Sequence, residues 1–194
     1  MKFHPITLDG RYVRLEPISQ SHHDEVCEAI SDGELWKIFT TMVPKVEHVE
    51  KFITMAQKAN ETGDGLTFAT VDKISGKIAG STRFMNTNLC YKRTEIGFTF
   101  LSRSFQKTVA NTEAKLLMLS HAFETHDLNR VEFITDFLNE KSRRAILRLG
   151  AKEEGLLRNH IVMPDGRVRD SVVYSIINSE WPNVKENLLG KIKS

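Results

Sequence analysis

The polar segment from Gln106 to Asn111 is the part of the sequence whose chemistry is easiest to interpret. It reads Gln-Lys-Thr-Val-Ala-Asn and joins a strand-like segment to an apolar helical one. The first N–H groups of a helix lack partners within it and the helix dipole is positive there, so such a connection suits an anion. We expect Asn111 to cap the helix. Glu113 suits the dipole but would repel a phosphate unless it points away. An ordinary strand-to-helix connection is the alternative interpretation.

Other reactive side chains do not form a metal or nucleophile site. His22 and His23 begin a surface helix without a third ligand at useful spacing, so we expect no metal. Cys27 and Cys90 lack the partners of a thiol nucleophile and are too few for a disulfide scaffold. No Ser-Gly pair stands in a nucleophile-elbow sequence, which argues against a serine hydrolase.

The anion-binding candidate lies within an alternating series of strands and helices. Strand patterns cover residues 12–16, 66–72, 77–86, 94–101 and 130–135, and two more flank residues 164–166. Helical patterns cover residues 22–30, a segment from Pro44 to Gly63, residues 112–126 and 139–149, and a short tail after Trp181-Pro182. This order predicts an α/β or α+β fold, with a mixed, mostly antiparallel sheet covered by helices on both faces.

The strand at residues 94–101 enters the candidate loop. Its alternation predicts Ile96, Phe98 and Phe100 on one face, with Glu95, Gly97 and Thr99 on the other. In the helix at 139–149, Ser142 shares the inward face with Ala145, Ile146 and Leu149, and Gly150 stands where a left-handed cap belongs.

Length and charge exclude several classes of protein. The 194 residues predict one domain, 1–194, and need no disulfide or metal to support a core. A net charge of +2 argues against a nucleic-acid partner, and no apolar run approaches a membrane span or a signal peptide. We therefore expect a soluble, cytoplasmic protein.

Several short motifs in order show a resemblance that covers nearly the whole chain. They are Leu8-Asp9-Gly10-Arg11, residues 75–83 (SGKIAGSTR), Glu95-Ile96-Gly97, Gln106-Lys107-Thr108, residues 111–115 (NTEAK), residues 139–143 (NEKSR), Leu149-Gly150-Ala151, Glu154-Gly155 with Arg158, and Glu180-Trp181-Pro182. Each is weak alone, but together they are specific. The chain resembles the GNAT acyltransferases, in particular the RimJ/RimL-like branch of ribosomal-protein N-acetyltransferases.

The resemblance implies the GNAT fold and an acyl-CoA, normally acetyl-CoA, between two central strands that splay apart. The pantetheine would lie along Thr99, Phe100 and Leu101. The pyrophosphate would lie on the loop and helix start made of Gln106, Lys107, Thr108, Val109, Ala110, Asn111 and Thr112. Asn139 and Ser142 match the family's second contact region with CoA.

The sequence departs from the family pattern at two places. Val109 and Asn111 occupy the positions where the loop usually has glycines, which permit positive φ and close backbone approach. This departure implies either a differently shaped loop or weaker phosphate binding. The Gln-x-Thr…Asn-Thr-Glu-Ala pattern resembles that of a sub-branch of the family, which favours the differently shaped loop. Ile146 stands where many GNAT enzymes have a tyrosine acid, so that role cannot be assigned.

Glu95 is the candidate general base, because a carboxylate desolvated in such a site has a raised pKa. A structural ion pair with Arg83 or Arg93 is the alternative. A backbone N–H after Glu95 is the candidate for polarising the thioester carbonyl. Ser142 is the candidate for holding the leaving thiolate, and a hydrogen bond to a backbone carbonyl one turn back is its alternative.

The acceptor is the least determined part of the prediction. Trp36, Phe39 and Arg83 are candidate lining residues, although the two aromatic residues would serve equally in the core. We expect acetyl transfer to a primary amine, either a protein N-terminus or a small molecule. A non-catalytic acyl-CoA-binding module is the second hypothesis, and a nucleic-acid or protein adaptor is a weaker third. A homodimer is compatible with this branch.

Overall fold

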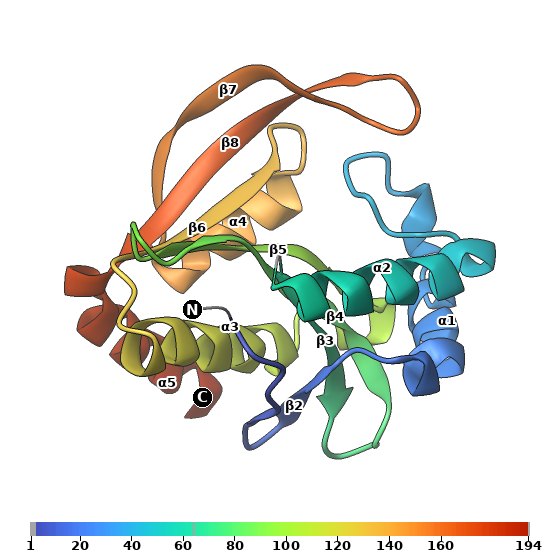
Figure 1. The fold of residues 1–194 in the computed structure, drawn as a ribbon, viewed down its shortest axis with the longest axis horizontal. Helices are drawn as coiled ribbons and strands as arrows, with labels where there is room; N and C mark the ends of the chain where they lie inside the picture. Colours follow the sequence, from blue (N-terminus) through green and yellow to red (C-terminus); the bar gives the residue numbers. More distant parts are fainter. Residues whose placement is uncertain (1–2, 64, 194) are drawn as a thin grey trace.

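The computed structural model describes residues 3–63 and 65–193, which form an eight-stranded sheet with helices on both faces (Figure 1). The strands are β1 (Leu8–Asp9), β2 (Val13–Pro17), β3 (Gly65–Asp72), β4 (Ile78–Asn88), β5 (Arg93–Leu101), β6 (Arg130–Asp136), β7 (Lys152–Val162) and β8 (Val168–Ile177). The helices are α1 (His23–Ser31), α2 (Val49–Thr62), α3 (Ala110–Ser120), α4 (Glu140–Leu149) and α5 (Trp181–Lys193). None of the described helices is long and apolar enough to cross a membrane.

The strand order is β1-β2-β3-β4-β5-β6-β8-β7. Neighbouring strands are antiparallel, except that β5 and β6 are parallel. The predicted mixed, mostly antiparallel sheet is therefore confirmed. A parallel pair needs a long crossover, and here that crossover is α3, which follows the polar loop.

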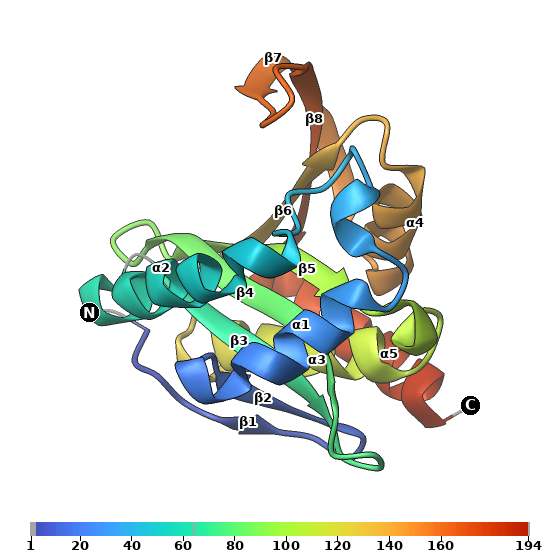
Figure 2. The same ribbon diagram turned by 90° about the vertical axis from the view of Figure 1, so that its right-hand side faces the viewer.

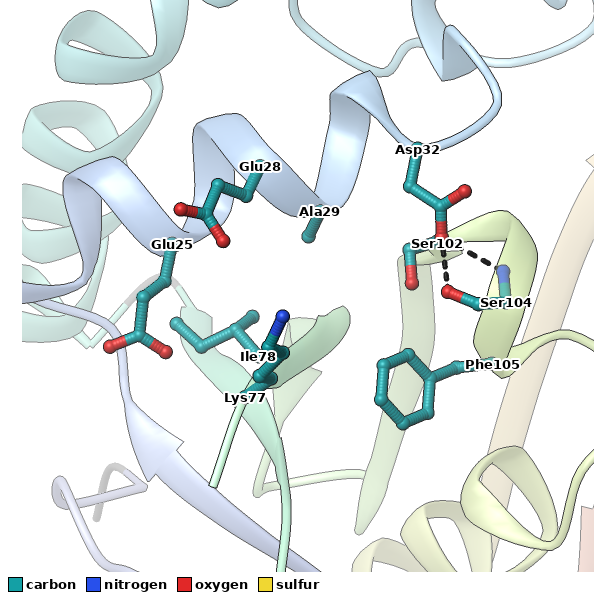
Figure 3. A pocket seen from close by; sticks show the side chains of 9 residues that line it. All are labelled: Glu25, Glu28, Ala29, Asp32, Lys77, Ile78, Ser102, Ser104 and Phe105. Carbon is teal, nitrogen blue, oxygen red and sulfur yellow. Dashed lines mark hydrogen bonds between the residues drawn. The ribbon is translucent and has the colours of Figure 1, made fainter. Parts of the chain in front are cut away.

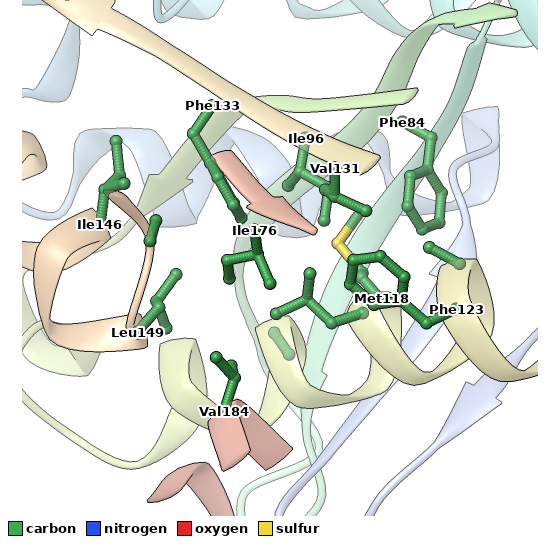
Figure 4. Close-up of a cluster of buried hydrophobic side chains, with 14 of the residues drawn as sticks. Phe84, Ile96, Met118, Phe123, Val131, Phe133, Ile146, Leu149, Ile176 and Val184 are labelled. Atoms are coloured by element: carbon green, nitrogen blue, oxygen red, sulfur yellow. The ribbon is translucent and has the colours of Figure 1, made fainter. Parts of the chain in front are cut away.

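Two hydrophobic clusters fill the two faces of the sheet. One contains residues of α3, α4 and α5 with β2–β6 and β8, and Figure 4 shows Met118, Ile96, Phe133 and Ile146 within it. The other contains residues of α1 and α2 with the ends of β3, β4 and β5. Figure 2 shows α1 and α2 on one side and α3 with α5 on the other. The loop before α3 thus leads from the end of β5, a central strand, onto the face of the sheet that α3 covers.

Helix ends follow from local sequence. Gly63 and Gly150 have φ of 75° and 104°, the left-handed conformation that glycine adopts without steric cost. Both were predicted as helix ends. The predicted strands also agree with the observed ones within two residues at each bound outside the β7–β8 hairpin, for which no bounds were predicted.

The predicted alternation along β5 is wrong beyond Gly97. Arg83 of β4 pairs with Gly97 and Ser81 pairs with Phe100, so one residue of β5 is extra in this stretch. Phe98 takes φ of 46°, which makes this a β-bulge. Ile96 consequently belongs to the α3-side cluster, whereas Phe100 belongs to the α1–α2 cluster and Phe98 is exposed. The bulge moves Thr99 to the α3 face, where it contacts Lys115.

Gly80 allows the end of β5 to lie close to β4. A Cβ at this position would come within 2.0 Å of the Phe100 carbonyl oxygen. Any other residue would push β5 away, so the close approach that fixes the bulged end of the strand requires glycine.

Glu113 of α3 connects the helix to the β1–β2 turn. Its carboxylate is buried and accepts hydrogen bonds from the backbone N–H groups of Arg11, Tyr12 and Val13 at 2.7–2.9 Å. A carboxylate is a strong acceptor for three converging donors. The side chain therefore points away from the loop and leaves the start of α3 open to an anion.

We predict that Glu113→Ala lowers the free energy of unfolding by about 3 kcal/mol, because three backbone donors lose their acceptor. Urea denaturation measures the change. Glu61→Ala on the exposed surface of α2 is the control and should stay within about 0.5 kcal/mol of the wild type. Equal effects of the two substitutions would contradict the role given to Glu113.

Candidate active site

The candidate site lies where β5 and β6 part. The two strands pair only over Arg93–Glu95 and Arg130–Glu132, after which β6 stays paired with β8 through Asp136. Beyond Glu95, β5 therefore loses its neighbour on that side, and the bulge at Phe98 lies within the unpaired stretch. Strands that part leave backbone N–H and C=O groups free to bind a ligand.

Glu95 is buried at the point of parting, with 6% of its surface exposed. Asn86 of β4 donates a hydrogen bond from Nδ2 to its carboxylate at 2.8 Å. Burial raises the pKa of Glu95, and the nearby Glu132 raises it further, while the Asn86 hydrogen bond and Arg169 oppose the shift. A carboxylate with a raised pKa is a stronger base than an ordinary one, which suits proton acceptance.

The alternative of a structural ion pair for Glu95 does not match its contacts. Arg93 pairs with Glu132 at 3.2 Å instead. The Arg83 guanidinium lies 5.7 Å from the centre of the Phe98 ring. Within residues 3–63 and 65–193, no ion pair joins Glu95 to either arginine.

The loop before α3 differs from the expectation in its cap. The helix begins at Ala110, so Asn111 lies inside its first turn and does not cap it. The N-cap position is Val109, which makes no side-chain cap, while the Thr108 hydroxyl accepts a hydrogen bond from the Ala110 N–H at 3.3 Å and donates one to the Phe105 carbonyl at 2.8 Å. Gln106 donates from its amide to the Leu101 carbonyl at 3.0 Å, which ties the loop to the end of β5.

The loop obtains its left-handed residue without glycine. Lys107 has φ of 65°, whereas Val109 has an ordinary helical φ of −65°. Neither Val109 nor Asn111 therefore needs glycine here. In the described chain, the N–H groups of Lys107, Thr108, Val109, Asn111 and Thr112 form no hydrogen bond. They make up a set of free donors at the positive end of α3.

Asn139 and Ser142 lie at the start of α4. The Asn139 side-chain oxygen caps the helix by accepting from the Ser142 N–H at 3.1 Å. The Ser142 hydroxyl, half-buried, forms no hydrogen bond with any described residue, so the backbone-bonded alternative is not observed. Ile146, where the family often has tyrosine, is buried in the core. Tyr174 is also buried, and its hydroxyl bonds Arg143 and Glu153.

The candidate acceptor residues are spread over two environments. Trp36 is half-buried and packs against the α1–α2 cluster. Phe39 is exposed and lies 5.4 Å below the guanidinium of Arg167, which also bonds the Phe39 carbonyl and the buried Asp136. Figure 1 shows the β7–β8 hairpin arching toward this loop. Arg167 thus connects the hairpin tip to the Phe39 loop and to the end of β6, a contact that sequence patterns did not indicate.

Two cavities lie beside β5. The smaller, about 40 Å³, lies against the bulge and is lined by residues 41–44, Phe52 and residues 98–100. The larger, about 290 Å³, lies between α1 and the chain after β5 (Figure 3). Its lining includes Glu25, Glu28 and Asp32, which does not suit an anionic ligand. Asp32 bonds the Ser104 N–H and hydroxyl, and these bonds lower the pKa of Asp32 while fixing the turn before the loop.

Besides the Arg167 contact, sequence reasoning missed three features of this site. Asn86 was not identified as the partner of Glu95, and the bulge at Phe98 was not expected. The third is Lys115, which follows Thr112 and precedes Met118 by three residues and therefore shares their buried side of the helix. This spacing could have indicated a buried lysine, but its charge was not considered. In the part of the chain that the structure describes, no three His, Cys, Asp or Glu side chains could hold a metal ion.

Comparison with known proteins agrees with this geometry. Residues 13–152 match the family model described as "Acetyltransferase (GNAT) domain". The chain is 32% identical to "Putative ribosomal N-acetyltransferase YdaF" of Bacillus subtilis over 110 residues, 57% of this chain and 59% of that protein. The structure of a GCN5-related N-acetyltransferase from Brucella melitensis has a TM-score of 0.89 and 32% identity, covering 99% of this chain and 87% of the other. Mycobacterium smegmatis RimJ in complex with CoA-disulfide has the same fold, with a TM-score of 0.82 and 22% identity over 97% of both chains.

We predict that Glu95→Gln stabilises the protein at pH 8 and has little effect near pH 4. The folded-state pKa of Glu95 is raised, so the folded protein binds more protons than the unfolded one, and stability falls as pH rises through that range. The amide removes this penalty and can still accept from Asn86. Thermal unfolding across the pH range measures the difference. A variant less stable than the wild type at pH 8 would contradict it.

Proposed function

Because the chain belongs to the GNAT acetyltransferase family, we propose that it transfers an acetyl group from acetyl-CoA to a primary amine by direct attack in a ternary complex. One observation carries the proposal: buried Glu95 stands where β5 and β6 part, next to a bulged strand whose backbone is free on that side. A base and free backbone donors at one point are what acyl transfer to an amine requires.

The chain's residues fit an acyl-CoA along this path. The free N–H groups of residues 107–109, 111 and 112 suit a pyrophosphate, and the unpaired edge from Thr99 to Leu101 suits the amide groups of a pantetheine. The Ser142 hydroxyl, which has no partner in the described chain, suits a contact from the α4 side. The structure of Mycobacterium smegmatis RimJ in complex with CoA-disulfide supports CoA as the ligand.

Acetyl-CoA supplies an activated thioester when bound, and the protein's residues prepare the amine. An amine arrives largely as an ammonium ion and becomes a nucleophile only after losing a proton. Glu95 in its ionised form accepts that proton, directly or through a water. Asn86 holds the carboxylate in place, and an N–H in the bulged part of β5 polarises the carbonyl. Ser142 is the candidate to stabilise the thiolate that leaves.

The acceptor is either a protein N-terminus or a small amine. The name of the Bacillus subtilis relative favours a ribosomal-protein N-terminus. Phe39, which lies under Arg167 of the hairpin tip, and Arg83, which lies over Phe98 at the bulge, are the residues expected to distinguish acceptors. The alternative, a module that binds acyl-CoA without transfer, has no observation in its favour, since the candidate base is present and buried.

The test is release of free thiol from acetyl-CoA with peptides that carry ribosomal-protein N-termini and with a panel of small amines. We expect turnover with at least one acceptor. Tight CoA binding without turnover on any of them would favour the binding module, and absence of CoA binding would contradict the proposal altogether.

We predict that Glu95→Gln lowers kcat/KM by about 10²–10⁴-fold while leaving the Kd for CoA unchanged, because only proton transfer is lost. In the wild type, kcat/KM should rise with pH as Glu95 ionises. Because the pKa of Glu95 is raised, the midpoint of this acid limb of the pH profile should lie above 4.5, the ordinary pKa of a glutamate. Asn86→Ala should move this limb to still higher pH, since the hydrogen bond that favours the charged form is gone. An unchanged profile in both variants would exclude Glu95 as the base.

We predict that Val109→Asp weakens CoA binding about tenfold or more, because a carboxylate directly before the first turn of α3 would face the pyrophosphate. The helix itself should tolerate the change, since a negative charge suits its N-terminus. Val109→Asn is the matched neutral control. Calorimetric titration with CoA and the melting temperature of each variant distinguish lost binding from lost folding. Equal affinity of both variants would mean that the pyrophosphate lies elsewhere.

A further inference from the structure

Lys115 is a buried lysine on the sheet-facing side of α3. Only 4% of its surface is exposed. Within the described residues it forms no ion pair, although buried lysines normally have an acidic partner. A buried charge without a counter-ion is costly, so its presence here needs a reason.

The charged groups on the elements around Lys115 are engaged elsewhere. On α3, Glu113 is bound by three backbone N–H groups, and on β5, Glu95 is bonded by Asn86 and alternates to the other face from Ile96. On the other strands, Asp9 of β1 pairs with Lys73, Arg14 and Glu16 of β2 pair with each other, Asp72 of β3 accepts from Ser75, Arg83 of β4 lies over Phe98, and Arg93 of β5 pairs with Glu132. At the end of α3, His121 lies in hydrogen-bond contact with His126. On α5, Lys185 pairs with Glu124, Lys191 bonds the Arg148 carbonyl, and Glu186 and Lys193 are exposed.

Two threonines connect Lys115 to the sheet, one on β4 and one on the unpaired end of β5. Its ammonium nitrogen lies 2.7 Å from the hydroxyl of Thr82 on β4 and 2.7 Å from that of Thr99 on β5. The two hydroxyls lie 2.8 Å apart. Thr82 is buried, whereas Thr99 is exposed and lines the small cavity at the bulge. Thr99 therefore lies between the buried charge and the surface on which the pantetheine is proposed to lie.

The same charge lies near the free donors of the loop. Lys115 is five residues after Ala110, about 7.5 Å along the helix axis. Long side chains on a helix extend back over the turn N-terminal to their own Cα. We therefore expect the Lys115 side chain to extend toward the first turn of α3, where the unbonded N–H groups begin.

The geometry points to a positioning role for Lys115: binding of CoA converts its side chain to the charged ammonium form, which then holds the anionic ligand at Thr99 and the start of α3. This rests on the proposed function, since it assumes that CoA occupies the parted strands. Each binding event takes up a proton from solvent, and that proton resides on Lys115 Nζ.

The direction of the effect follows from burial. Burial alone lowers the pKa of Lys115 to about 7, so at pH 8 the free protein holds it mostly neutral. A bound polyanion stabilises the ammonium form and raises its pKa. Binding should then take up as much as ~0.9 proton per site at pH 8, and CoA affinity should fall as pH rises from 7 to 9.

If Lys115 served only the fold, its replacement by methionine would lower the free energy of unfolding, whereas the proposed role predicts no loss of stability. The folded-state pKa of Lys115 lies below its unfolded value of 10.5, so the folded protein binds fewer protons and the lysine lowers stability at neutral pH. Lys115→Met removes this penalty, and Thr82 and Thr99 keep each other as hydrogen-bond partners. The variant should therefore fold and be at least as stable as the wild type.

The experiment is calorimetric titration of the full chain with CoA at pH 8, in two buffers of different ionisation enthalpy, which counts the protons taken up. We expect net uptake by the wild type, none by Lys115→Met, and an affinity about tenfold weaker in that variant. Thr99→Val, which removes the connecting hydroxyl, should weaken binding and reduce uptake. Lys58→Met, on the exposed surface of α2, removes one charge elsewhere and should match the wild type.

The outcomes separate this inference from the proposed function. If the wild type does not bind CoA, the proposed function fails, and this inference fails with it. If the wild type binds CoA without proton uptake, or if Lys115→Met takes up as many protons as the wild type, the inference alone is overturned. A destabilised Lys115→Met variant with unchanged CoA affinity would likewise overturn it and assign Lys115 to the fold.

Discussion

The site depends on one constraint, the unequal pairing of β6. This strand pairs with β8 over seven residues but with β5 over only three, so it follows β8 when the two directions diverge. β5 instead stays with β4, and the bulge at Phe98 bends its unpaired end. The divergence leaves backbone groups free, and it directs the end of β5 into the loop that begins α3. A ligand that replaced the lost pairing would satisfy these groups without breaking any existing bond.

Two buried ionisable groups lie on opposite faces of this parted edge, and both make the fold less stable. Burial raises the pKa of Glu95 and lowers the pKa of Lys115 to about 7, so each is held closer to its neutral form than in water. Neither has an ion-pair partner among the described residues, although Glu113, equally buried, has three hydrogen-bond donors. Destabilising groups at one edge are expected where function requires them, because selection for stability alone would replace them.

The sequence predicted those parts of the structure that local interactions determine. Glycines at 63 and 150 end their helices, and the order of strands and helices follows from hydrophobic periodicity. The grouping of Glu95, the loop and Ser142 into one candidate site came from the resemblance rather than from periodicity, and it stays a prediction. The bulge could not be predicted, because it depends on how β4 and β5 pair across the sheet. The Arg167 contact joins residues 128 positions apart, and Lys115 required knowledge of which helix face is covered.

The loop before α3 shows why residue identity is an incomplete guide to a binding site. Glycine matters in such loops because it permits positive φ, yet here Lys107 takes that conformation while Val109 and Asn111 remain helical. A left-handed lysine costs roughly 1 kcal/mol, and the hydrogen bonds of Thr108 and Gln106 on either side hold it in place. What an anion requires is a set of free N–H groups at a helix start, and two different sequences can supply them. The absence of the usual glycines therefore indicates a different route to the same donors rather than a lost site.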